Sequence, residues 1–138
     1  EMSGHMFFAD EYYGYDDAVY AAARLLRILT HTTKPLSALF ADVPRLPTTP
    51  EIRVDCPDEV KFDVVRALTD EFRNRYPVID IDGVRVLFPA GWGLIRASNT
   101  QPALVLRAEA SSTSDLQQIK DEIERALTRF AGVGRVTW

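Results

Sequence analysis

The stretch VIDIDGVRVLFPAGWGLIRASNTQPALVLRAEA, residues 78–110, decides the fold. It contains four short runs rich in residues that favour extended structure: Val78 to Ile81, Val84 to Phe88, Trp92 to Arg96 and Ala103 to Glu109. The connections between these runs are too short for helical crossovers. We therefore expect four successive strands whose neighbours pair antiparallel.

The segments on either side of these strands complete a compact unit. Glu51 to Asp55 reads as a further strand, and about Asp58 to Arg75 as a helix. A last helix opens at Ser112, with Asp115 in a capping position. The resulting order, β-α-β-β-β-β-α, is that of an α+β fold with a four- to five-stranded sheet. The side chains expected to face its core are Val65, Leu68, Phe72, Leu116, Ile119, Ile123, Leu127 and Phe130.

The N-terminal third has a different organisation. Asp16 or Asp17 can cap a helix that ends near Thr30 to Thr33. Its apolar side chains at one face are Val19, Ala22, Ala23, Leu26 and Leu29. A short apolar piece, Leu36 to Phe40, precedes three closely spaced prolines, Pro44, Pro47 and Pro50, which cannot sustain regular structure. We place a domain boundary there, with one domain at residues 1–45 and another at 46–138.

Composition bounds the classes of function. The chain has 138 residues, of which 46% are hydrophobic and 26% charged, so it is large and apolar enough to form one hydrophobic core. Its formal charge of −4 gives no general attraction to nucleic acid or to anionic membranes, so we expect neither as a partner. No apolar stretch approaches membrane-spanning length, and no signal peptide is visible. The single cysteine, Cys56, is expected to be a buried structural thiol.

The loop RASNTQP, residues 96–102, carries the clearest chemistry. Arg96 offers a planar fork of donors that fits two phosphate oxygens, Ser98 and Thr100 offer hydroxyls, and Asn99 offers an amide. Pro102 limits the freedom of the segment. Such a loop favours phosphate binding without a metal, although composition alone leaves an ordinary hairpin turn with a solvated arginine as an equal alternative. Trp92 between two glycines is expected to anchor this loop, and His31 to be a solvated residue at a helix end.

Two motifs resemble one known family. The segment GWGLIRASNTQPALVLRAEA, residues 91–110, closely resembles the C-terminal phosphate-binding motif of the α-D-phosphohexomutases, in particular the bacterial phosphomannomutase/phosphoglucomutase enzymes. EMSGHMFF, residues 1–8, resembles the sugar-binding loop of the preceding domain, and the similarity continues through YDDAVYAAARLLRIL, residues 15–29. The resemblance implies the end of the family's third domain, a truncated α/β segment, followed by its fourth. That fourth domain is an antiparallel sheet with two helices on one face, like the TATA-box-binding protein.

The motif EMSGH has two interpretations. Neighbouring residues of an extended segment point to opposite faces and no oxyanion hole is apparent, so a Ser/His nucleophile pair is disfavoured. Alternation instead projects Glu1, Ser3 and His5 to the same side, where they can meet sugar hydroxyls. By resemblance, Glu1 and Ser3 match the residues that bind two ring hydroxyls, and His5 aligns with an active-site histidine. The family's glycine before the Glu is absent, and a free amino group beside Glu1 would perturb its electrostatics.

The resemblance also implies an activity for a longer parent protein. Family enzymes interconvert hexose 1-phosphate and 6-phosphate through a phosphoserine and a hexose 1,6-bisphosphate, with Mg²⁺. The phosphoserine loop and the Asp-rich magnesium loop are not found here, so we expect no catalytic residue and no metal ligand in this chain. Asp80 and Asp82 fit a hairpin better than a metal site. Expected partners are glucose or mannose phosphates and the remaining domains of the same cytoplasmic, monomeric enzyme, while the fragment alone can self-associate.

Three alternatives stay open. Phosphoglucosamine mutase is the nearest, but its loops usually carry Gly where Asn99 stands and Gln where Met2 stands. A free-standing, non-catalytic sugar-phosphate-binding module is the second, if Glu1 is a natural start. The third is a stable fragment with no measurable ligand affinity.

Overall fold

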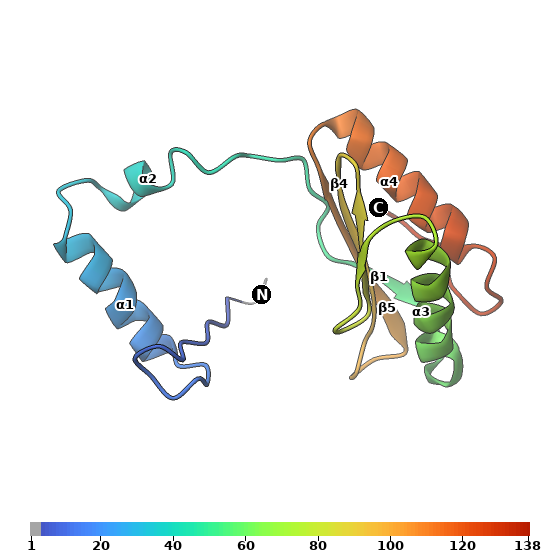
Figure 1. Cartoon of the computed structure of the whole chain (residues 1–138). Helices are drawn as coiled ribbons and strands as arrows, with labels where there is room; N and C mark the ends of the chain where they lie inside the picture. Colours follow the sequence, from blue (N-terminus) through green and yellow to red (C-terminus); the bar gives the residue numbers. More distant parts are fainter. Residues whose placement is uncertain (1–3) are drawn as a thin grey trace. The chain divides into compact units, whose positions relative to one another are not determined.

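The computed structural model describes residues 4–138, which divide into one compact unit that ends at Pro44 and another, Arg45–Trp138 (Figure 1). The first unit contains helices α1 (Ala18–Thr30) and α2 (Leu36–Leu39). The second contains β1 (Ile52–Asp55), α3 (Asp58–Arg73), β2 (Val78–Ile79), β3 (Val84–Phe88), β4 (Gly91–Ala97), β5 (Ala103–Ala110) and α4 (Thr113–Leu127). The predicted order β-α-β-β-β-β-α is confirmed.

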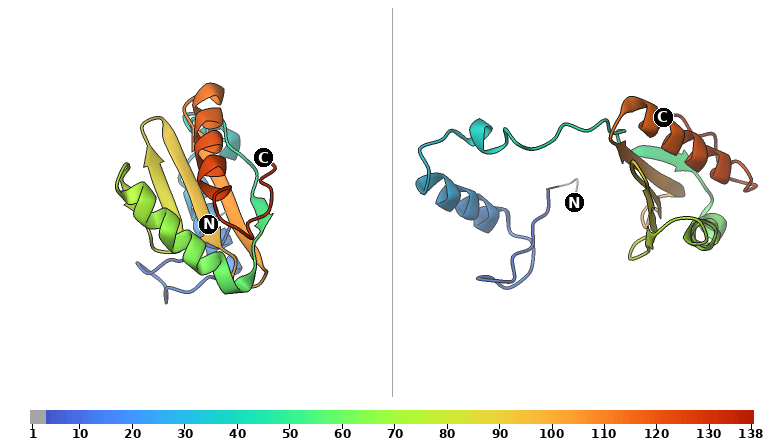
Figure 2. Two further views of the ribbon diagram at one scale, coloured as in Figure 1. Left: turned by 90° about the vertical axis from the view of Figure 1, so that its right-hand side faces the viewer. Right: turned by 45° about the horizontal axis from the view of Figure 1, so that its top comes forward.

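The second unit is built on a five-stranded antiparallel sheet in the order β1-β5-β4-β3-β2. Strands β3 and β4 are joined by only Pro89 and Ala90, which forces them into a hairpin. Strand β1 lies on the far edge, beside β5, with Val54 opposite Leu104. Helices α3 and α4 both cover one face of the sheet (Figure 2), as predicted.

Alternation along the strands divides the core from the open face of the sheet. Val84, Val86 and Ile95 are fully buried against the helices, whereas Arg85 and Arg96 point to the opposite face. Gly93 lets α4 approach closely, because a Cβ there would lie 2.4 Å from Cδ1 of Ile123. The largest fully buried side chains are Phe72, Leu68, Ile95, Leu104, Leu106, Ile123 and Leu127.

Three predicted elements are longer than the observed ones. The strand expected to reach Ile81 ends at Ile79, because residues 80–83 turn back toward β3 and leave Ile81 93% exposed. Helix α3 ends at Arg73 rather than Arg75. Phe130 lies beyond the end of α4 and is only partly buried, although it still packs against the core.

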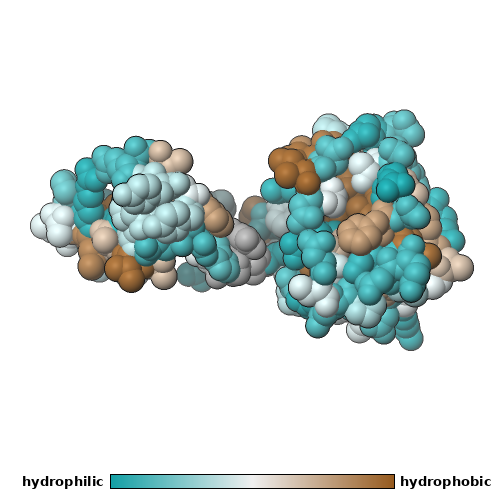
Figure 3. Space-filling model, turned by 90° about the horizontal axis from the view of Figure 1, so that it is seen from below, coloured by the Kyte–Doolittle hydropathy of each residue, from teal (hydrophilic) through white to brown (hydrophobic). Residues whose placement is uncertain are grey.

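The first unit has little core of its own within the described residues. Asp17 caps α1 as predicted, yet no residue of that helix is buried, and Val19 of the expected apolar face is 80% exposed. Aromatic contacts stabilise the segment before the helix, since the rings of Tyr12 and Tyr20 stack with centroids 3.9 Å apart. Hydrophobic side chains form several separate patches on the face shown in Figure 3. Over residues 4–138, no helix is both long and apolar enough to cross a membrane.

Candidate functional site

The loop that follows β4 is a tight turn held by its own first residue. The amide of Ser98 donates to the carbonyl of Ala103 at 2.9 Å, which continues the ladder between β4 and β5. The Oγ of Ser98 accepts from the amides of Thr100 at 3.4 Å and Gln101 at 3.2 Å. Ser98 is buried, and its hydroxyl hydrogen stays available to donate. This side chain therefore shapes the loop as well as being a candidate ligand contact.

Arg96 lies beside this turn on the open face of the sheet. Its side chain is 37% exposed, and its Nη1 lies 3.3 Å from Oδ2 of Asp82 in the turn before β3. The side chains of Asn99 and Thr100 are exposed at the tip of the loop. The structure thus brings a guanidinium, an amide and a hydroxyl to one end of the sheet, where donors of this kind can surround an anion.

Two hydrogen bonds join the end of the loop to the residue after β1 and to the first turn of α3. The sequence patterns did not predict these contacts. The amide of Cys56 donates to the carbonyl of Pro102 at 2.9 Å, and Nζ of Lys61 donates to the carbonyl of Gln101 at 3.0 Å. Cys56 is buried, as predicted, and burial raises the pKa of its thiol. The one available signal for Lys61 was its position three residues after Asp58, which resembles an ordinary surface pair on a helix.

Trp92 does not anchor the loop, and that prediction was wrong. It lies at the opposite end of β4, opposite Glu109, whose carboxylate accepts from the indole N–H at 3.2 Å. The guanidinium of Arg85 covers its ring at 4.3 Å from the centroid. The segment from Gly93 to Ala97 separates Trp92 from the loop, so its contacts stabilise the other end of the sheet.

The N-terminal candidates fall only partly within the described residues. Glu1 and Ser3 lie outside them. His5 is half-exposed, and its Nε2 lies 3.5 Å from Oδ2 of Asp16. It contributes to a small pocket at the N-terminus of α1, lined by Gly4, His5, Met6, Asp16, Asp17, Ala18 and Ala21. His31 is exposed at the end of α1, as predicted, with Nδ1 2.7 Å from the carbonyl oxygen of Arg27.

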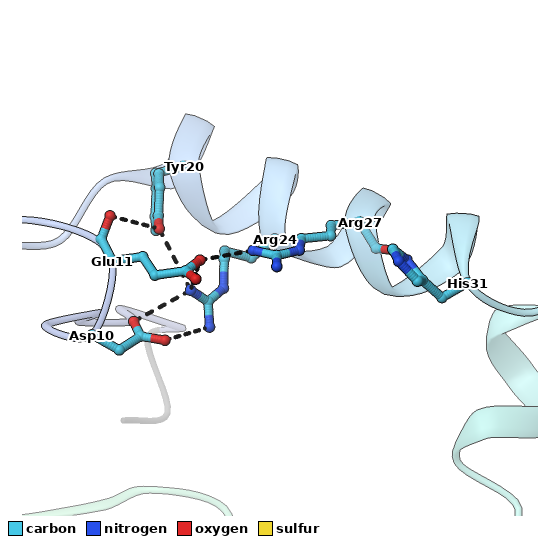
Figure 4. Close-up of polar contacts among 6 residues, drawn as sticks. All are labelled: Asp10, Glu11, Tyr20, Arg24, Arg27 and His31. Atoms are coloured by element: carbon cyan, nitrogen blue, oxygen red, sulfur yellow. Dashed lines mark hydrogen bonds and ion pairs between the residues drawn. The ribbon is translucent and has the colours of Figure 1, made fainter.

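Salt bridges hold the segment after His5 against α1 (Figure 4). Arg24 donates to both carboxylate oxygens of Asp10 at 3.2 and 2.9 Å, and Arg27 donates to Glu11 at 2.7 Å. The hydroxyl of Tyr20 donates to the carbonyl of Glu11 at 3.2 Å. The guanidinium of Arg24 lowers the pKa of Asp10, so both groups stay ionised at neutral pH. These contacts fix the path of the chain between the EMSGH motif and the helix.

The cap of α1 makes the helix sensitive to acid. Hydrogen bonds from the amide of Tyr20 and then from the hydroxyl of Tyr12 lower the pKa of Asp17 below 3.8. Its contribution to stability is therefore complete above pH 3.8 and disappears as the pH falls through the lower folded-state value. We expect the helical chemical shifts of Ala18–Thr30 to diminish in that acid range. In Asp17→Asn, which caps without titrating, this loss should be smaller; an identical acid loss there would contradict the prediction.

Comparison with known proteins places these features in a family. The sequence model of the "Phosphoglucomutase/phosphomannomutase, C-terminal domain" matches residues 51–126, more than half of the chain. The chain belongs to this family. A second model, of the family's "alpha/beta/alpha domain III", matches residues 1–46. The resemblance inferred from the two motifs is thus confirmed, and so is the fold that it implied.

Individual relatives agree with this assignment. A phosphomannomutase/phosphoglucomutase of Pseudomonas putida is 50% identical over 130 residues, which are 94% of this chain and 28% of the relative. A probable phosphoglucosamine mutase of Methanopyrus kandleri is 38% identical over 77% of this chain and 24% of its own length. A crystal structure of a phosphoglucomutase/phosphomannomutase family protein from Burkholderia thailandensis has a TM-score of 0.79 at 39% identity, covering all of this chain and 29% of that protein. The chain therefore spans less than a third of these family members.

A metal site was not expected in this chain. Residues 4–138 contain no group of three His, Cys, Asp or Glu side chains placed to hold a metal ion.

Proposed function

We propose that the RASNT loop binds the phosphate group of a hexose phosphate. The observation that carries the proposal is the side chain of Arg96, which is 37% exposed, has one ion pair, to an exposed carboxylate, and lies at the end of β4 from which the loop with the exposed Asn99 and Thr100 begins. The Ser98 hydroxyl supports the turn and donates to the same anion. Because the whole chain carries a charge of −4, the attraction must come from this local group of donors.

The proposal extends to the parent enzyme. We propose that it is a cytoplasmic phosphohexomutase that interconverts hexose 1-phosphate and 6-phosphate through a phosphoserine and a hexose 1,6-bisphosphate, with Mg²⁺ and the reacting groups held by its other domains. Glu1, Ser3 and His5 are proposed to bind sugar hydroxyls. Residues 1–45 would then be the end of the third domain, and residues 46–138 the fourth. Pro44, Pro47 and Pro50 make the segment between them a candidate hinge.

In this scheme the loop binds the phosphate that is not reacting. It holds the substrate by a group remote from the reacting bond, so its binding energy supports orientation. The substrate must be held in two orientations, with either of its phosphates at the reacting position. A site that contacts only the phosphate group, through a guanidinium and small polar side chains, can bind the substrate in either orientation of the sugar ring.

Phosphoglucosamine mutase is the second candidate, and the similarity to the Methanopyrus kandleri protein favours it. Asn99, where the phosphoglucosamine enzymes usually carry Gly, favours the hexose enzymes. The two candidates share the phosphate and differ at the sugar 2-position, so the distinction is addressed by comparing the affinities for glucose 1-phosphate and glucosamine 1-phosphate, and not by the loop shifts that both should cause.

The test is a titration of the isotopically labelled 138-residue chain. Glucose 1-phosphate, mannose 1-phosphate, glucosamine 1-phosphate and inorganic phosphate are added separately, with free glucose as the control. We expect the amides of residues 96–101 to shift with every phosphate, and none to shift with glucose. Phosphate-dependent shifts confined to other residues, or no response at millimolar ligand, would contradict phosphate binding by this loop.

A further inference from the structure

Lys61 is a buried charged residue whose ammonium contacts the loop from behind. It lies in the first turn of α3, is 4% exposed, and donates through Nζ to the carbonyl of Gln101, forty residues further along the chain. Its second partner is a carboxylate oxygen of Asp58, which is itself exposed. One side chain therefore links the start of a helix, the loop and the solvent-facing carboxylate.

The burial of Lys61 needs a structural explanation, because removing an ammonium group from water costs free energy. The side chain of its ion-pair partner, Asp58, is 65% exposed, so solvent weakens the pair and it offsets only part of the cost of burying the ammonium. The buried polar residues among 4–138 are Thr49, Lys61, Thr69 and Ser98. Two of them, Lys61 and Ser98, make hydrogen bonds to the backbone of the same loop. Half of these buried polar residues therefore contact this one loop.

The contact also arranges charge around the loop. A loop that binds an anion through amides, hydroxyls and a guanidinium is weakened by any carbonyl oxygen directed at that anion. Lys61 binds the carbonyl of Gln101 on the inner side, while Ser98 Oγ holds the amide of the same residue. The side chain of Gln101 is held separately, since its Oε1 accepts from Nη1 of Arg53 at 2.5 Å.

We propose that Lys61 is a positioning residue for the phosphate loop. Its ammonium, together with the amide of Ala103, which donates to the same carbonyl at 2.8 Å, holds the Gln101 carbonyl inward and places a positive charge beneath the loop. This inference rests on the proposed function, because the ligand of the loop is the phosphate group assigned above. Lys61 itself contacts no substrate; it acts through the conformation and potential of residues 98–101.

The test compares substitutions at Lys61 with a matched change on the same helix. Lys61→Met removes the charge and the hydrogen-bond donor while keeping an unbranched side chain one bond shorter, and Lys61→Arg keeps the charge. Thr69→Val removes another buried polar group of α3, whose hydroxyl donates to Val65 at 2.8 Å and not to the loop. For each variant of the 138-residue chain we measure thermal unfolding, the amide shifts of residues 98–101, and the affinity for inorganic phosphate and glucose 1-phosphate.

We expect Lys61→Met to move the amide shifts and weaken phosphate binding about tenfold, equivalent to about 1.4 kcal/mol. Lys61→Arg should recover part of the affinity. Thr69→Val should lower the unfolding temperature without changing affinity in the folded protein. If Lys61→Met does not fold, Lys61→Gln, whose neutral side chain is one bond shorter, is measured instead and should show the same loss.

Two results separate this inference from the proposed function. Wild-type amide positions and unchanged affinity in a folded, neutral Lys61 variant would overturn the positioning role while leaving phosphate binding intact. If the wild-type loop binds no phosphate, the proposed function fails. The role of Lys61 in positioning the loop would then be tested without ligand. The amide shifts of residues 98–101 must change in the neutral Lys61 variant and stay unchanged in Thr69→Val.

Discussion

Gly83→Ala is expected to destabilise the unit Arg45–Trp138 by at least about 3 kcal/mol, because two costs add at this residue. Gly83 has φ +84°, a conformation that costs an L-residue about 1–2 kcal/mol. A Cβ there would also lie 2.4 Å from the carbonyl oxygen of Ile95 and 2.8 Å from Cα of Arg96. Both neighbours are backbone atoms of β4 and cannot rotate away.

Gly132→Ala provides the control for the strain of the backbone alone. Gly132 has φ +89°, but its added Cβ would meet only ordinary contacts, such as Pro57 Cδ at 3.7 Å. Chemical denaturation of both variants should therefore show a clearly larger loss for Gly83→Ala. In Gly83→Ala the amide chemical shift of Arg96 should also change, because relief of the clash must move β4. Equal losses in the two variants would show that the close approach to Arg96 has no energetic consequence.

Arg96→Ala is expected to weaken the binding of glucose 1-phosphate by roughly ten- to a hundredfold. Charge-assisted hydrogen bonds contribute about 1.5–3 kcal/mol each, and a guanidinium can make two of them to one phosphate. Arg96→Lys should fall between the alanine variant and the wild type, because it keeps the charge and loses the planar fork. Isothermal titration at physiological salt measures all three affinities.

Arg85→Ala is the matched control for the charge. Arg85 lies on the same open face of the sheet, is paired with Leu94 in the register, and stacks on Trp92 at the end away from the loop. Its removal changes the net charge by the same amount as the removal of Arg96. We expect less than a threefold change in affinity for Arg85→Ala, as its charge is distant and screened by salt. Equal losses in the two variants would mean that the site responds to overall charge and not to Arg96.

The elements that the sequence predicted well depend on local patterns. Alternation identified the strands. Residue type offered Asp16 or Asp17 as one helix cap and Ser112 as the start of the last helix, and in the structure Asp17 and Ser112 accept hydrogen bonds from amides three residues on. The loop motif placed Arg96, Asn99 and Thr100 together because they are neighbours in the chain. The predicted end of β2 was wrong by two residues, since Ile81 continues the apolar pattern but lies in the turn.

The contacts that the sequence did not predict join residues far apart in the chain. The sequence analysis did not single out Lys61, which is buried in the structure where Gln101, forty residues away, approaches it. Trp92 was assigned to the loop because it is close in sequence, although an extended strand of five residues carries it roughly 17 Å away. The contact of Asp82 with Arg96 likewise follows from the pairing of β3 with β4, in which Val84 lies opposite Ile95.

The types and order of the elements, the residue types of the RASNT loop and the resemblance to the phosphohexomutases can be read from the sequence alone. Each of these depends on side-chain periodicity or on residues adjacent in the chain. The tertiary structure alone decided that β1 pairs with β5, that Lys61 is buried beneath the loop and that Gly83 lies against Arg96. These features arise when distant segments are brought together to share one core, and no local pattern encodes which distant residue will be the neighbour.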